Sequence, residues 1–220
     1  PVPYGAAEEG EKYEGSTAAA TRTENGTLLG CYDVQLDEQG YLTAYRLIGQ
    51  DEPAKGDKWY AYLEIATESP WYNNQTYVNT LDKKAMDRFI EITYESYNRT
   101  IADEFDQTVP SIFTDEPQFS HKGTLKFAKD REDVTLPWTD DLADTFRAAY
   151  GEDLIAGIPE LIWELPDGRV SVIRYHYHDH ICERFTEAFA DNCGKWCRDH
   201  HLKLTGHMME EPTLRSQTAA

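Results

Sequence analysis

Basic side chains are scarce in this sequence. The 220 residues include 21 lysines and arginines against 40 aspartates and glutamates, and the formal net charge is −19. Such a chain repels phosphate groups, so neither nucleic acid nor an anionic membrane is expected as a partner. A neutral sugar is not repelled by a negative surface. The same acidity also serves solubility alone, and the charge by itself does not decide between the two interpretations.

Long apolar runs are also missing. No stretch approaches the roughly 20 consecutive apolar residues that span a bilayer. The sequence also contains no basic segment followed by an apolar run, the pattern that would predict a signal peptide. The localisation therefore stays open. Because the sequence begins with Pro1 and stops soon after a predicted strand, we expect it to be a piece of a longer polypeptide with further domains.

Motifs of nucleophilic hydrolases, phosphate-binding proteins and metallopeptidases are missing as well. There is no Gly-x-Ser-x-Gly and no glycine-rich phosphate loop. The triplet of His176, His178 and His180 lacks the glutamate of the metallopeptidase pattern, because Tyr177 stands in its place, and we expect a solvated helix flank. No metal ligand and no cofactor is predicted. The four cysteines lack zinc-knuckle spacing and are expected to be reduced core thiols: Cys31, Cys182, Cys193 and Cys197.

What is present is a globular composition, 40% hydrophobic, that changes along the chain. Residues 1–26 have almost no large aliphatic side chains and predict a loose segment. Residues 27–76 predict a β-rich subdomain or barrel insertion. Its strands are expected at 28–36 and 41–48, around a turn at 37–40, and at 59–66.

Residues 77–220 alternate between helical and strand patterns, which is typical of a parallel sheet. We therefore expect the fold class to be α/β, a partial or complete (β/α) TIM-like barrel with the β-rich part as an N-terminal insertion. A whole barrel needs about 250 residues. The expected elements are a helix at 80–97, a strand at 109–113, a helix at 140–150, a helical turn at 153–158, a helix at 170–200 and a strand at 202–208.

Two apolar stripes predict the buried faces of the longer helices. Trp59 and Trp196 are also expected in the core, and Thr80 is expected to cap the first helix. The first stripe consists of Leu81, Ala85, Phe89, Ile92 and Tyr97, and the second of Ile173, Tyr177, Ile181, Phe185, Phe189, Cys193 and Trp196.

Both strands of the barrel-like part end in acidic residues followed by proline. Functional groups of (β/α) barrels lie where strands end, and glycosidic cleavage needs two carboxylates, one to donate a proton and one to attack or activate water. In the first ending we prefer Glu116 to Asp115 as the catalytic acid, because side chains alternate along a strand. In the second ending the choice between Glu210 and Glu211 stays open.

The segments Phe113-Thr114-Asp115-Glu116-Pro117, Tyr77 to Asp82 and Thr205 to Glu211 resemble large bacterial glycoside hydrolases of the alpha-L-rhamnosidase type, family 106 and its uncharacterised relatives. The resemblance covers roughly residues 30–212. It implies Glu116 as general acid and a glutamate on a later strand as base, which Glu210 or Glu211 matches. Such relatives are usually several times longer, and some use calcium, for which no ligand can be assigned here.

Sugar sites also need aromatic platforms and polar side chains. Trp71, Tyr72 and Asn74 lie together in a predicted loop, and Trp138 lies in the loop region after the first acidic strand end. Together with Asp115 and His207, they are predicted to bind an oligosaccharide or glycoside substrate. His207 is equally compatible with a purely structural role.

The predicted function is therefore that of a glycoside hydrolase. The alternative is a non-catalytic carbohydrate-binding or scaffold fragment, which would use the aromatic side chains without the carboxylate pair. A lyase acting on acidic polysaccharide is disfavoured, because the negative charge of the chain does not suit a uronate.

Overall fold

The structure is a computed structural model that describes residues 26–120 and 122–207, which form mixed α/β structure. The chain divides into two compact units, and the division passes through one helix. The first unit contains residues 1–76 and 120–180, and the second contains residues 77–119 and 181–220. The boundary at 76/77 coincides with the predicted one, whereas residues 120–180 group with the β-rich part. The segment predicted to be loose, residues 1–26, lies outside the described residues except for Gly26.

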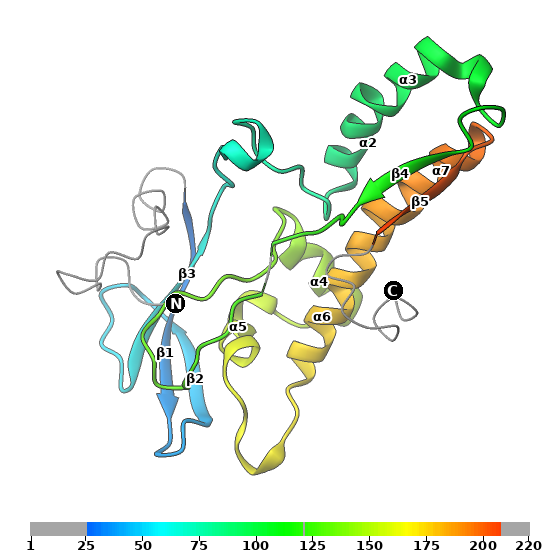
Figure 1. Ribbon diagram of the computed structural model, residues 1–220. Helices are drawn as coiled ribbons and strands as arrows, with labels where there is room; N and C mark the ends of the chain where they lie inside the picture. Colours follow the sequence, from blue (N-terminus) through cyan, green and yellow to red (C-terminus); the bar gives the residue numbers. More distant parts are fainter. Residues whose placement is uncertain (1–25, 121, 208–220) are drawn as a thin grey trace. The chain divides into compact units, whose positions relative to one another are not determined.

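The first unit is built on a three-stranded antiparallel sheet with the order β2-β1-β3 (Figure 1). The predicted turn is confirmed: the Tyr41 amide donates to the Asp37 carboxylate at 2.9 Å, and Gly40 has a φ of 94°, which glycine adopts readily. The elements of this unit are β1 (Thr27–Leu36), β2 (Leu42–Ile48), β3 (Asp57–Leu63), η1 (Pro70–Tyr72), α4 (Leu142–Tyr150), α5 (Leu154–Ile162), η3 (Pro166–Gly168) and the first part of α6 (Val172–Phe185).

Helix α5 packs against this sheet. The rings of Trp59 and Trp163 meet edge to face at 4.8 Å, and the Tyr32 hydroxyl donates to the Ile155 carbonyl at 2.6 Å. Pro159 lies four residues after Ile155, inside the helix, and has no N–H for that carbonyl. The buried hydroxyl of Tyr32 therefore replaces the missing helical hydrogen bond.

The second unit combines helices with a two-stranded parallel sheet. Strands β4 and β5 pair in the register Ser111↔Lys203 to Asp115↔His207, as the β/α alternation predicted. Its elements are α2 (Lys83–Ile92), α3 (Tyr94–Ile101), η2 (Ala102–Glu104), β4 (Ser111–Asp115), the end of α6, η4 (Thr186–Asp191), α7 (Asn192–Asp199) and β5 (Lys203–His207). No closed barrel is formed within residues 26–120 and 122–207, and the partial barrel stays a prediction.

The first predicted helical stripe is confirmed only in part: Leu81 is buried and Phe89 packs against the core, but Ile92 and Tyr97 are 54% and 55% exposed. The buried face of α2 runs through Met86 and Ile90, so Ile92 lies off that face, and Tyr97 belongs to a second helix, because α2 ends at Ile92 and α3 begins at Tyr94. Asp82, and not Thr80, caps α2 by accepting from the Lys84 amide. The buried residues of this segment are Leu81, Met86, Ile90 and Tyr94.

The predicted helix at 170–200 is interrupted by a π-helical segment, η4. Most of its stripe is nevertheless buried, including Tyr177, Ile181 and Trp196. The expectation for the cysteines holds for three of them, whereas Cys182 is exposed. The predicted turn at 153–158 is the longer helix α5. None of the helices in the described part of the chain combines the length and apolar character needed to cross a membrane.

We expect Tyr32→Phe to lower the free energy of unfolding by about 1–3 kcal/mol, because the Ile155 carbonyl loses its buried donor. In a Pro159→Ala background the residue at 159 has its own N–H, so the same substitution should cost clearly less. Urea denaturation of the four proteins gives both values. Tyr41→Phe, at an exposed position, is the control. An equal loss in both backgrounds would contradict this account.

Candidate active site

The parallel pairing of β4 with β5 places two predicted site residues side by side. Asp115 and His207 are the last residues of their strands and are register partners. The His207 Nδ1 lies 3.3 Å from the Asp115 Oδ1. Both side chains are largely exposed, so the pair is accessible at the carboxyl end of the sheet.

Alternation along the two strands separates a covered face from an open one. Ile112 and Leu204 pack against the core of the second unit. Phe113, two residues before Asp115, is 58% exposed, and its ring meets that of His207 edge to face at 5.2 Å. The open face therefore combines an aromatic ring, an imidazole and a carboxylate. Phe113 was not predicted as a site residue, although the period of two places it on the same face as Asp115.

Gly206 permits the close approach of the strands at this end. A Cβ at this position would lie 1.8 Å from the Thr114 carbonyl oxygen, and its φ is 156°. No other residue type fits this position without moving β4. The glycine before His207 is thus a structural requirement of the pair.

Glu116 follows β4 in a strained conformation. Its φ is 43°, although the residue before a proline favours extended backbone and a side chain in the left-handed region costs roughly 1–2 kcal/mol. Its amide donates to the His207 carbonyl at 3.2 Å, which ties it to β5. Strain of this kind clusters at functional sites, and here it falls on the predicted catalytic acid.

The loop after Glu116 is held by the segment that precedes α2. The Thr80 hydroxyl, in a 2% exposed residue, donates to the Gln118 carbonyl at 2.7 Å. The Gln118 amide donates to the Tyr77 hydroxyl at 3.3 Å. Pro117, which lies between Glu116 and Gln118 in the sequence, is buried. Thr80 therefore positions the acidic loop.

The remaining predicted site residues have different locations. Glu210 and Glu211 lie outside the described residues, so the preference for Glu116 over Asp115 and the choice of the second carboxylate stay predictions. Trp71, Tyr72 and Asn74 belong to the first unit, where the backbone of this turn closes through Asn74 N–H to Ser69 O at 2.9 Å. Tyr72 and Asn74 are exposed, and Trp138 lines a pocket of the first unit.

The histidines of α6 are not simply a solvated flank. His180 is 5% exposed and contacts the Thr145 hydroxyl at 2.9 Å, while the His176 Nδ1 lies 2.6 Å from the Glu152 carboxylate. His178 is exposed overall, but partial desolvation of its ring and the positive charge of Lys122 lower its pKa. Across residues 26–120 and 122–207, no group of three or more His, Cys, Asp or Glu is placed to hold a metal ion.

We expect Gly206→Ala to lower the free energy of unfolding by at least about 2 kcal/mol, since its Cβ collides with backbone. It should also speed hydrogen exchange at the Glu116 amide. Gly151→Ala is the matched control, because Gly151 has a φ of 72° but open space around it. Its cost should stay near 1 kcal/mol. Equal effects of the two substitutions would refute the close approach.

Thr80→Val keeps the shape of the side chain and removes the hydrogen bond to Gln118. We expect a loss of about 1–2 kcal/mol in the free energy of unfolding, together with faster hydrogen exchange at the Gln118 amide. Thr100→Val removes a similar bond on the exposed surface of α3 and should change neither quantity. Unchanged exchange in Thr80→Val would show that the loop is held by other contacts.

Comparison of the chain with models of known families, with curated proteins and with solved structures finds no match. The resemblance to rhamnosidases therefore stays an expectation based on the motifs.

Proposed function

We propose that this chain carries the catalytic carboxylates of a glycoside hydrolase at the carboxyl ends of β4 and β5. The observation that carries the proposal is the parallel register that ends at Asp115 and His207. It joins the Phe-Thr-Asp-Glu-Pro segment and the Thr-Gly-His segment at one edge of one sheet. Acidic residues follow β5 in the sequence at Glu210 and Glu211.

The open face supports a barrel origin for this sheet. In a (β/α) barrel each strand packs one face onto helices and turns the other towards the barrel axis, and the chemistry lies at the carboxyl ends. Ile112 and Leu204 occupy the helix side, while Phe113, Asp115 and His207 occupy the other side. A partial (β/α) barrel accounts for this division.

The proposed roles follow from the chemistry of glycosidic cleavage. Glu116 donates a proton to the leaving oxygen, and Glu210 or Glu211 acts as the second carboxylate. Neighbouring strands are about 4.8 Å apart, so acids that follow them suit the roughly 5–10 Å separation of retaining and inverting pairs. Asp115 and His207 bind sugar hydroxyls, and the Phe113 ring contacts the apolar face of the sugar.

A leaving-group series with Glu116→Gln in the intact polypeptide tests the proton donor. We expect kcat for alkyl glycosides, whose leaving group needs protonation, to fall by about 10²–10⁴. The loss should be much smaller for a dinitrophenyl glycoside of the same sugar, because that leaving group departs without a proton. Steady-state rates for the two substrates give the comparison.

Glu132→Gln, at an exposed position of the first unit, is the control and should keep wild-type rates. Wild-type turnover of alkyl glycosides by Glu116→Gln would exclude Glu116 as the acid. In that case Asp115→Asn, tested with the same series, would show whether its neighbour is the donor.

A further inference from the structure

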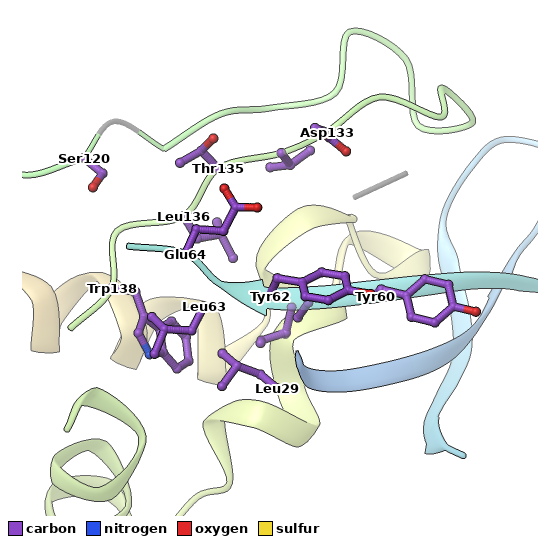
Figure 2. A pocket seen from close by; sticks show the side chains of 13 residues that line it. Leu29, Tyr60, Tyr62, Leu63, Glu64, Ser120, Asp133, Thr135, Leu136 and Trp138 are labelled. Carbon is purple, nitrogen blue, oxygen red and sulfur yellow. The ribbon is translucent and has the colours of Figure 1, made fainter. Parts of the chain in front are cut away.

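A separate pocket lies within the first unit, beside the edge strand β3 (Figure 2). Its volume is about 220 Å³, below the roughly 300–1,000 Å³ of sites for drug-sized ligands. A ligand of about one ring therefore suits it. Aliphatic side chains form part of the wall. The aromatic and polar side chains of the wall include Tyr60, Tyr62, Trp138, Glu64, Asp133 and Thr135.

Two tyrosines form a platform in this pocket. Tyr60 and Tyr62 are two residues apart on β3, so they share a face. Their ring centroids are 6.5 Å apart and their planes differ by 29°, and Figure 2 shows the rings one after the other along the strand. Both side chains are half-buried. Such a surface suits a flat ligand with an apolar face.

The polar groups of the pocket carry oxygen atoms. Glu64 is the first residue after β3, and its side chain turns towards the loop that bears Thr135 (Figure 2). Asp133 supplies a second carboxylate. Among the described residues that line the pocket, none is Lys, Arg or His, so an anionic ligand would meet only repulsion.

The loop that covers the pocket is held in place by contacts within the first unit. The Gly123 amide donates to the Thr135 carbonyl at 2.7 Å, and Arg131 pairs with Asp57 at 2.7 Å. The Trp163 Nε1 donates to the Ala128 carbonyl at 2.8 Å. The pocket is therefore preformed, which limits the entropy lost on binding.

We propose that this pocket binds one pyranose ring of a neutral saccharide. The ring stacks on Tyr60 and Tyr62, and its hydroxyls donate to the carboxylates of Glu64 and Asp133. Aromatic rings and acidic side chains also attract quaternary ammonium ligands. Sites for such ligands are cages of rings that meet at steep angles, whereas the ring planes of Tyr60 and Tyr62 differ by only 29°. The preference for a sugar over other neutral rings rests on the proposed function.

Binding is measured by ligand-observed saturation-transfer NMR and by tryptophan fluorescence, because Trp138 lines the pocket. The probes are methyl α-L-rhamnopyranoside, methyl α-D-glucopyranoside and methyl β-D-galactopyranoside. We expect at least one to bind, and Tyr62→Ala to weaken its Kd about tenfold, the loss of one aromatic contact. Tyr175→Ala, an exposed tyrosine of the same unit that does not line the pocket, should leave Kd unchanged.

The outcomes separate this proposal from the hydrolase. Binding that depends on Tyr62 and persists in Glu116→Gln supports the pocket, even if no glycoside is hydrolysed. A second outcome would overturn the pocket alone: Glu116→Gln shows the expected leaving-group dependence of hydrolysis, but Tyr62→Ala weakens the binding of none of the pyranosides. Binding of tetramethylammonium that depends on Tyr62, with none of the pyranosides, also overturns it. Circular dichroism of Tyr62→Ala confirms that the variant is folded.

Discussion

The approach of β4 to β5 at Thr114 and Gly206 is the constraint on which the candidate active site depends. Only a glycine lets the backbones come this close, since a Cβ would lie 1.8 Å from the Thr114 carbonyl oxygen. Once the strands are in register, Asp115 stands beside His207, and the Glu116 amide reaches the His207 carbonyl. The strained backbone of Glu116 then follows from its position between a paired strand end and a buried proline.

Packing on the covered face explains how a sheet of two strands is held. Parallel strands are rarely stable with both faces in water. Here Ile112 and Leu204 join a core that includes Met86, Phe189 and Trp196, so burial anchors one face and leaves the other exposed. The bond from Thr80 to Gln118 extends this anchoring to the loop beyond Pro117.

Local patterns in the sequence predicted the elements that local physics controls. The hairpin at 37–40 and the alternation of β3 follow from turn residues and a period of two, and the structure contains them. The strand ends differ from the prediction by up to three residues, since β3 ends at Leu63 and β4 at Asp115. The predicted stripe of α2 and α3 was wrong at Ile92, which lies off the face of Met86 and Ile90, and at Tyr97, which lies beyond a helix break at Thr93 that no proline or glycine marks. The π-helical segment likewise has no signature in the residue pattern.

Contacts between segments far apart in the sequence could not be predicted from such local patterns. The hydrogen bonds of Thr80 and Tyr77 with Gln118, and that of Tyr32 with Ile155, join residues separated by 38 to 123 positions. The left-handed Glu116 was also unforeseen, because its proline neighbour favours the opposite conformation. The sequence thus predicted the parallel pairing of the two strands, but not the contacts that hold the loop beyond them, and the meeting of two carboxylates stays a prediction.

Two sets of acidic side chains lie in different surroundings in this chain. Glu64 and Asp133 line a pocket that also contains Tyr60, Tyr62 and Trp138. Asp115 stands at a strand end beside the imidazole of His207, and Glu116 is the next residue along the chain. The two sets share no residue and belong to different units. Substitutions at Glu64 or Asp133 therefore probe the pocket, and substitutions at Asp115 or Glu116 probe the strand ends, without altering a residue of the other set.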